Sequence, residues 1–128
     1  MLKFLIADDQ SSWRNFHTNA IKSLYNENSI IIDIADSAQS GYSKVLENIS
    51  SPYNVIITDM QMEDDYAPKM AGEWLIEQIK MLSSYYKTKI VIVSASPRIK
   101  QIAEFYEVNY LPKSVAIASA EAYKEVLS

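Results

Sequence analysis

The sequence predicts an α/β fold, a doubly wound sheet of five parallel strands with five helices. Short runs rich in β-branched and aliphatic residues alternate along the chain with longer segments whose apolar residues recur at helical spacing. The short runs are almost continuously apolar, as expected of parallel strands that carry helices on both faces. With 128 residues the chain has the usual size of one domain. We therefore expect a single domain, residues 1–128.

Five strands are expected where the apolar runs are short and lack helical spacing. They cover residues 2–7, 30–34, 54–58, 89–93 and 108–111. Right-handed crossovers between parallel strands give a doubly wound sheet, whose sites lie at the carboxyl ends of the strands.

Five helices are expected between and after the strands, at residues 12–26, 37–49, 72–82, 97–106 and 115–127. Ser11 or Ser12 can cap the first helix, and Asp36 or Ser37 the second, before Pro52 stops it. Apolar residues at helical spacing give the first helix a stripe that should cover the sheet. These are Trp13, Phe16, Ala20, Ile21 and Leu24.

Residues 60–71 have no clean helix or strand period and are interpreted as a long loop. The acidic residues Glu63, Asp64 and Asp65 and the proline Pro68 lie within it. The acidic trio lacks the alternating oxygen ligands and the central glycine of a calcium loop, so we expect it to be solvated.

Composition and charge exclude several classes of protein. The chain has no cysteine, which fits a reducing compartment and excludes a disulfide framework. Its net charge is −4 and its basic residues are dispersed, so direct binding to nucleic acid is not expected. The apolar run at residues 2–7 is too short for a signal peptide or a membrane span. We expect a cytoplasmic protein; whether the sequence is part of a longer chain stays open.

Polar residues follow four of the predicted strands directly. Asp8 and Asp9 follow the first strand, Asp59 the third, Ser94 the fourth, and the fifth runs into Lys113. Three carboxylates at one edge of a sheet should raise one another's pKa unless a cation compensates them. Hard oxygen ligands favour Mg²⁺, which binds a few carboxylates and phosphate oxygens.

This set of residues is suited to phosphoryl transfer. A carboxylate can accept a phosphoryl group and form an acyl phosphate. A lysine can neutralise the non-bridging oxygens, and a serine hydroxyl can donate a hydrogen bond to one of them.

Over its whole length the chain resembles the receiver domain of two-component response regulators, in particular the stand-alone, chemotaxis-regulator-like type with a flavodoxin-like fold. Each matching piece is short, and it is their order that makes the resemblance specific. The pieces are FLIADD at 4–9, VIITDMQM at 55–62, GEWL at 72–75, IVIVSA at 90–95 and YLPK at 110–113.

The resemblance implies that Asp59 is the phosphoacceptor. Asp8, Asp9 and Asp59, with the main-chain carbonyl of Gln61, would hold Mg²⁺. The donor would be a phosphohistidine on a histidine kinase or a phosphotransfer protein. Such a chain is a phosphoacceptor switch that promotes its own phosphorylation and dephosphorylation, and is not a classical enzyme.

The resemblance also implies that Ser94 and Lys113 contact the phosphoryl group and that Tyr110 is the aromatic switch residue. The signal would leave by protein contact, through the face formed by the fourth helix, the fifth strand and the fifth helix, to a downstream protein target. The protein would be a monomer or a phosphorylation-dependent dimer. Exposed candidates on that face are Ile99, Lys100, Tyr106 and Ala118.

The sequence departs from the family pattern in two places. Met62 is followed by Glu63 where the family has a Met-Pro pair, and the loop is longer. Ser114 follows Lys113 where the family commonly has a proline after a cis peptide. A cis bond to a non-proline residue costs about 3 kcal/mol, and the isomer of the Lys113–Ser114 peptide stays open.

Two other functions of α/β proteins fit the sequence less well. An aspartyl phosphatase of the haloacid-dehalogenase type needs an acid two residues after the nucleophile. Two residues after Asp8 and Asp59 the sequence has glutamines, Gln10 and Gln61, which argues against this class. A flavin carrier needs a glycine- and hydroxyl-rich phosphate loop after the first strand. The sequence there, QSSW at 10–13, supplies little of this. A phosphorylation-independent interaction module with the same fold stays open as the alternative.

The remaining polar and aromatic residues have plainer interpretations. His17 lies near the apolar stripe of the first helix, where packing or surface exposure is expected rather than a relay or ligand role. Trp13 and Trp74 are interpreted as core or interface anchors.

Overall fold

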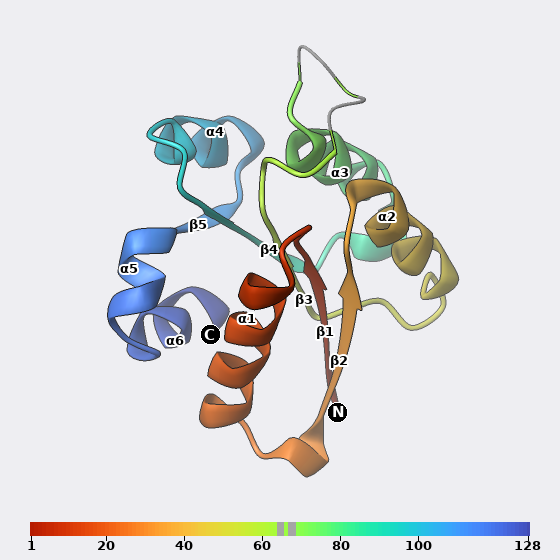
Figure 1. Ribbon diagram of the computed structural model, residues 1–128. Helices are drawn as coiled ribbons and strands as arrows, with labels where there is room; N and C mark the ends of the chain where they lie inside the picture. Colours follow the sequence, from red (N-terminus) through yellow and green to blue (C-terminus); the bar gives the residue numbers. More distant parts are fainter. Residues whose placement is uncertain (64–65, 67–68) are drawn as a thin grey trace.

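The computed structural model describes residues 1–63, 66 and 69–128 (Figure 1). Over these residues, five parallel strands form one sheet in the order β2-β1-β3-β4-β5, so the predicted doubly wound sheet is confirmed. The strands are β1 (Leu2–Ala7), β2 (Ile30–Ala35), β3 (Val55–Thr58), β4 (Lys89–Ser94) and β5 (Asn109–Pro112).

Helices cover both faces of the sheet. They are α1 (Ser11–Leu24), α2 (Ala38–Glu47), α3 (Ala71–Lys80), α4 (Ile99–Tyr106), α5 (Lys113–Ala118) and α6 (Glu121–Leu127). Short 3₁₀ turns occur at Glu27–Ser29 and Ser83–Tyr85. Within the described part of the chain, no helix has the length and apolar character needed to cross a membrane.

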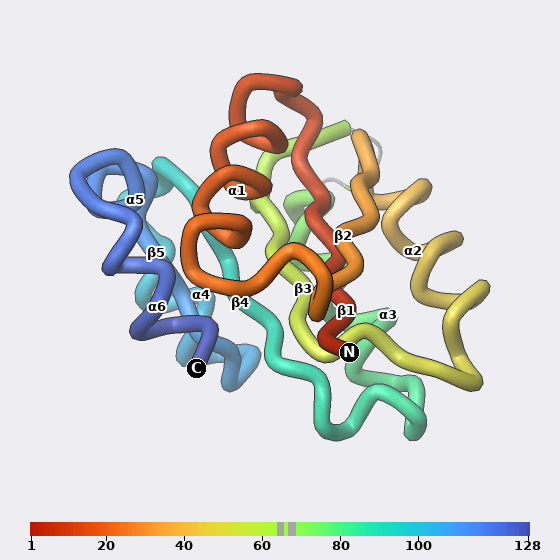
Figure 2. Tube along the Cα trace, turned by 90° about the horizontal axis from the view of Figure 1, so that it is seen from below, coloured from red at the N-terminus to blue at the C-terminus, as the bar shows by residue number. Residues whose placement is uncertain are grey.

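The core has two layers because successive side chains of a strand point to opposite faces of the sheet. Phe4 and Ile6 of β1 pack with residues of α1, α5 and α6, while Leu5 and Ala7 pack with residues of α2, α3 and α4. Figure 1 shows α1, α5 and α6 on one side of β1 and β2, and α2 and α3 on the other. Seen from below in Figure 2, α1 crosses one face of the strands while α2 lies beyond β2.

The prediction of one helix over residues 115–127 was wrong, because the structure divides this segment into α5 and α6. The break is at Ser119, whose backbone is extended (φ −166°, ψ 138°). The Ser119 hydroxyl oxygen accepts the Glu121 N–H at 3.1 Å, and its carbonyl accepts the Ala122 N–H at 3.2 Å. Serine competes in this way with the helical hydrogen bonds, so it ends one helix and begins the next.

The expected cap of the second helix is confirmed and that of the first is wrong. Ser37 caps α2, since its hydroxyl oxygen accepts the Ser40 N–H at 3.0 Å and the Ser40 hydroxyl oxygen accepts the Ser37 N–H at 3.1 Å. Helix α1 starts at Ser11, so Gln10 occupies the N-cap, and its side chain makes no capping hydrogen bond.

Glu63 is not the solvated loop residue that we expected. It is half-buried, and its carboxylate accepts the N–H groups of Ala38 at 2.6 Å and Gln39 at 3.2 Å, at the amino end of α2. A negative charge is favourable there because the first amides of a helix lack partners within it. The expectation for Asp64, Asp65 and Pro68 concerns positions that lie outside the described residues.

The far end of the same loop is held by aromatic packing. The ring of Tyr66 stacks on Trp74 of α3, with centres 4.5 Å apart and planes inclined by 22°. The Tyr66 hydroxyl donates to the side-chain oxygen of Gln39 at 3.2 Å. Trp74 also packs against the core beside α2, in agreement with its interpretation as an anchor.

Candidate acidic site at the carboxyl ends of the strands

The site is built by two neighbouring strands that end at the same level. Ala7 of β1 pairs with Thr58 of β3, so Asp8 and Asp59, the next residue on each strand, lie side by side. Main-chain hydrogen bonds continue past the strand ends, from the Asp59 N–H to Ala7 at 3.0 Å and from the Asp8 N–H to Ala35 at 3.1 Å. The sequence order of the sheet reverses around β1, which is where doubly wound folds place their sites.

Three carboxylates gather there, as the sequence predicts. Asp8, Asp9 and Asp59 each offer an oxygen atom within 4.8 Å of the others. Asp8 and Asp59 are buried, at 0% and 5% exposed, while Asp9 faces solvent. Oδ1 of Asp8 accepts the Gln10 N–H at 3.0 Å, whereas Oδ2 is buried without a hydrogen-bond partner among the described residues.

These residues fit a divalent cation. An unpartnered buried carboxylate oxygen is costly, and a cation that binds it removes the cost. Three hard oxygen donors with one side open to solvent fit Mg²⁺, which keeps several waters and binds a phosphate oxygen.

Asp59 lies between the ammonium group of Lys113 and a main-chain amide. Its Oδ2 is 2.9 Å from Nζ of Lys113, and its Oδ1 accepts the Met60 N–H at 2.7 Å. Burial raises the pKa of Asp59 although Lys113 lowers it, and the charge of Asp8 raises it further. The expected mutual repulsion of the carboxylates therefore contributes, but burial is the larger cause.

Lys113 is the first residue of α5 and follows β5 directly. Its Nζ atom is 4.0 Å from Oδ2 of Asp8 and 4.8 Å from the centre of the Trp13 ring. The side chain is 12% exposed. The ammonium group is thus held between two carboxylates and an aromatic face, where it can neutralise charge on an oxyanion.

Ser94 and Tyr110 lie on the strands that lead to this edge. Ser94 is the last residue of β4 and is buried; it pairs with Pro112, the neighbour of Lys113, and its hydroxyl oxygen accepts the Ser96 N–H at 3.1 Å. Tyr110 of β5 pairs with Ile92, is half-buried, and packs on the face covered by α2, α3 and α4. Gln61 is exposed, two residues beyond Asp59.

Gly72 makes close backbone packing possible beneath Asp59. Its N–H donates to the Met60 carbonyl at 2.9 Å. A Cβ atom at position 72 would lie 2.1 Å from the Asp59 carbonyl oxygen and 2.7 Å from Cα of Met60, both backbone atoms. Only glycine fits there, so the GEWL piece of the sequence marks a contact that positions the turn carrying Asp59.

The acidic site is also contacted by three residues of α1, to which the sequence analysis gives no role in it. Trp13 lies beside Lys113, and Nη1 of Arg14 donates to the Asp8 carbonyl at 2.9 Å. His17 is buried at 1% exposed, with Nδ1 2.7 Å from the Tyr123 hydroxyl and Nε2 3.9 Å from Oδ2 of Asp8. Packing was the correct expectation for His17, but Tyr123 is 106 residues away, so sequence spacing could not predict this contact.

One residue proposed for the exposed output face is misassigned. Ile99 is buried at 6% exposed, because it faces the core from the first turn of α4. Lys100 and Ala118 are exposed, as expected, and Tyr106 is half-buried, with its hydroxyl donating to the carboxylates of Glu73 and Glu77.

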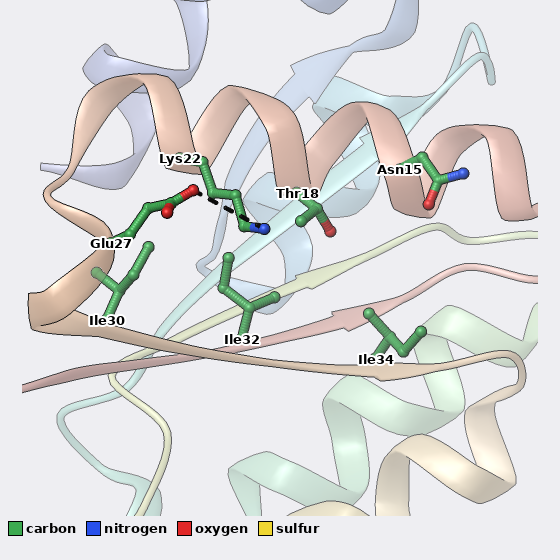
Figure 3. A pocket seen from close by; sticks show the side chains of 7 residues that line it. All are labelled: Asn15, Thr18, Lys22, Glu27, Ile30, Ile32 and Ile34. Atoms are coloured by element: carbon green, nitrogen blue, oxygen red, sulfur yellow. Dashed lines mark ion pairs between the residues drawn. The ribbon is translucent and has the colours of Figure 1, made fainter.

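A groove elsewhere on the surface is separate from the acidic site. It has a volume of about 490 Å³ and runs between α1 and the edge strand β2 (Figure 3). Ile30, Ile32 and Ile34 form its floor, and Lys22 pairs with Glu27 at 4.0 Å at one end. None of the acidic-site carboxylates lines it, so it contributes nothing to the chemistry described above.

Comparison with solved structures identifies the architecture. The chain is similar to the chemotaxis response regulator CheY4 of Vibrio cholerae, with a TM-score of 0.75 and 23% identity over 99% of this chain and 96% of that one. The chain has the receiver-domain fold. A CheY-like receiver domain from Methylobacillus flagellatus gives a TM-score of 0.73 and 19% identity, over 100% of this chain and 99% of that one. A response regulator receiver domain protein from Clostridium thermocellum gives a TM-score of 0.70 and 23% identity, over 99% of this chain and 94% of that one.

The receiver-domain fold is thus established over nearly the whole chain, including the strand ends that carry the acidic site. No protein-family model and no curated protein sequence matches the chain. At these identities the likeness concerns the fold, and the chemistry has to be argued from the residues themselves.

Proposed function

We propose that this receiver fold works as a phosphorylation switch in two-component signal transduction, with Asp59 as the phosphoacceptor. One observation carries the proposal above all: the buried Asp59 carboxylate contacts Lys113 at 2.9 Å and shares an oxygen cluster with Asp8 and Asp9. This arrangement combines a nucleophile, a cation and a set of metal ligands at one sheet edge.

The transfer needs little more than positioning and charge. An oxygen of Asp59 attacks the phosphorus of a phosphohistidine; the new O–P bond forms as the N–P bond breaks, and its electron pair stays on the imidazole of the donor. Lys113 offsets negative charge on the transferred group. Mg²⁺ held by Asp8, Asp9, Asp59 and the main-chain carbonyl of Gln61 would neutralise further charge on the phosphoryl oxygens.

Ser94 and Tyr110 connect the site to the surface in this proposal. The hydroxyl of Ser94 donates to a phosphoryl oxygen, and Tyr110, two residues before Pro112 on β5, changes its side-chain position in response. Both residues are close to the ends of strands that lead into α4 and α5. The signal leaves by protein contact through the face formed by α4, β5 and α5, which carries the exposed Lys100 and Ala118.

The partners follow from this chemistry. A histidine kinase or histidine phosphotransfer protein supplies the phosphoryl group, and a downstream protein reads the phosphorylated face. The acyl phosphate is lost to water in a step that the same site promotes, so the chain switches and resets without being a classical enzyme.

Intact mass spectrometry tests the proposal. The protein is incubated with a small-molecule phosphodonor, with and without Mg²⁺, as wild type and as Asp59→Asn. We expect a Mg²⁺-dependent gain of one phosphoryl group that is absent from Asp59→Asn and is removed by hydroxylamine, which cleaves acyl phosphates. Glu104→Gln, at an exposed position of α4, is the matched control and should be labelled normally.

No gain in mass in folded, Mg²⁺-loaded wild type would contradict the proposal. It would favour the alternative, a receiver-like interaction module that binds its partners without phosphorylation. Labelling that survives in Asp59→Asn would assign the acceptor role to another residue.

A further inference from the structure

The interior behind the acidic site holds a second polar group. His17 of α1 is 1% exposed and lies between Asp8 and Tyr123, a buried residue of α6. Its Nδ1 is 2.7 Å from the Tyr123 hydroxyl oxygen, and its Nε2 is 3.9 Å from Oδ2 of Asp8. These three side chains form a line from α6, through α1, to the end of β1.

The tautomer of His17 decides which group donates in the contact with Tyr123. Burial raises the pKa of Tyr123, and the negative charge of Asp8 raises it further, so the hydroxyl keeps its proton. A neutral imidazole that accepts a hydrogen bond at Nδ1 carries its own proton at Nε2. Because Nε2 is the ring nitrogen that faces the Asp8 carboxylate, a proton is favoured there, and Nδ1 is left to accept from the Tyr123 hydroxyl.

The second contact is too long for a hydrogen bond, and this matters for the site. A ring N–H at 3.9 Å attracts the carboxylate through its charge distribution but leaves the lone pairs of Oδ2 free. That oxygen has no hydrogen-bond partner among the residues that the structure describes. Oδ1, by contrast, is fixed by the Gln10 N–H, so the carboxylate is oriented from both sides.

Neighbouring rings keep the imidazole in this position. The Trp13 ring centre is 5.5 Å from that of His17, and the Tyr123 ring centre is 5.7 Å from it. Nζ of Lys113 is 4.0 Å from the same Asp8 oxygen.

We propose that Tyr123 and His17 form a positioning relay for Asp8: the tyrosine fixes the tautomer of the histidine, and the histidine holds Oδ2 of Asp8 ready for a divalent cation. His17 and Tyr123 are positioning residues, which touch neither the cation nor the phosphoryl group. The inference rests on the proposed function for the identity of the cation. Partners of this kind behind a metal ligand typically change metal affinity by ten- to a hundredfold.

Nuclear magnetic resonance of the metal-free protein tests the first half of the relay. Nitrogen-15 shifts of the His17 ring should show an unprotonated Nδ1 and a protonated Nε2 in the wild type. In Tyr123→Phe, which keeps the ring and removes the hydroxyl, we expect this preference to weaken. A wild-type ring with its proton on Nδ1, or on both nitrogens, would overturn the relay.

Calorimetric titration with MgCl₂ tests the second half. His17→Leu removes the N–H and should weaken Mg²⁺ binding by about tenfold. His17→Gln places an amide donor near Asp8 and should restore most of the affinity. Tyr85→Phe, which removes another buried hydroxyl on the opposite face of the sheet, is the control and should bind Mg²⁺ like the wild type.

The two experiments separate failure of the relay from failure of the proposed function. If the wild type binds Mg²⁺ and folded His17→Leu binds it equally well, the relay is wrong and the metal site stands. If the wild type binds no Mg²⁺, the metal site of the proposed function is wrong. The relay, as a device that orients Asp8, is then decided by the tautomer: Nε2–H supports it and Nδ1–H overturns it.

Discussion

The ammonium group of Lys113 lies over the indole ring of Trp13, with Nζ 4.8 Å from the ring centre. The same atom is 2.9 Å from Oδ2 of Asp59. Because the lysine is largely buried, its attraction to the ring is less screened than at a surface. A residue of α1 thus helps to hold the ammonium group that faces Asp59.

The Trp13–Lys113 contact should be measurable as a coupling energy. In a double-mutant cycle with Trp13→Leu and Lys113→Met, we expect a coupling of about 1–2 kcal/mol in the free energy of urea unfolding. The exposed pair Tyr86 and Lys87, with Nζ 5.5 Å from the ring centre, provides a control cycle that should give about 0.5 kcal/mol. Equal couplings for the two pairs would contradict the role given to burial.

Replacing Asp59 should stabilise the protein at neutral pH. The pKa of Asp59 is raised by burial, whereas in the unfolded chain it is about 3.9. Between these two values the folded protein binds more protons than the unfolded one, so the free energy of unfolding decreases as the pH rises. Asp59→Asn removes this contribution, and we expect a gain of roughly 0.5–2 kcal/mol at pH 7 and a flatter pH dependence.

Urea unfolding at several pH values checks this expectation, with the exposed Glu104→Gln as control. A loss of stability in Asp59→Asn at pH 7 would mean that the contact with Lys113 outweighs the cost of burial.

Mg²⁺ should stabilise the folded protein by binding at the three carboxylates. At a concentration one hundred times its Kd, a ligand of the folded state adds about 2.7 kcal/mol to the free energy of unfolding. Asp9→Asn, at the exposed ligand, should abolish most of this gain without disturbing the core. Thermal melts with and without MgCl₂ give the comparison, and a gain that persists in Asp9→Asn would remove this residue from the ligand set.

The two glycines of the chain should respond very differently to alanine. Gly72→Ala places Cβ against the Asp59 backbone, and we expect it to lower the free energy of unfolding by roughly 3 kcal/mol or more. Gly41→Ala meets the end of the Leu75 side chain at 3.3 Å and Cβ of Ala7 at 3.6 Å, and alanine is the better helix former. Its effect should stay within about 1 kcal/mol in the same urea experiment. Similar losses in both variants would contradict the structural reason given for Gly72.

The cap that Glu63 provides should contribute to stability. Glu63→Ala leaves two amides of α2 without their side-chain partner, and we expect a loss of about 1 kcal/mol in urea unfolding. Glu63→Gln keeps an acceptor but removes the charge, so its loss should be smaller, about 0.3–1 kcal/mol. Glu125→Ala, at an exposed position of α6, serves as the control and should change little. Equal losses at positions 63 and 125 would contradict the capping role.

The sequence is informative wherever one local pattern determines the outcome. Strand β1 covers the predicted residues because an apolar run ends at two aspartates. The rule that parallel strands expose their carboxyl ends at one edge then brings Asp8, Asp9 and Asp59 together. The glycine of the GEWL piece likewise marks the point where the chain passes so close to Asp59 that no side chain fits.

The sequence is uninformative where the outcome depends on partners that are distant along the chain. Glu63 reads as one acid in an acidic loop, and only the packing of the loop on α2 makes it a cap. Residues 115–127 keep a helical apolar spacing on both sides of Ser119, which hides the break between α5 and α6. The position of His17 gives no indication that its partners are Asp8 and Tyr123, from two other elements.

The break at Ser119 separates two supports that a continuous helix would join rigidly. Lys113 begins α5, while Tyr123 belongs to α6 and is anchored to α1 through His17. A single rod from residue 113 to residue 127 would carry any displacement of Lys113 directly to Tyr123. Because an extended residue separates the two short helices, a shift of Lys113 does not have to displace Tyr123 or the histidine that contacts Asp8.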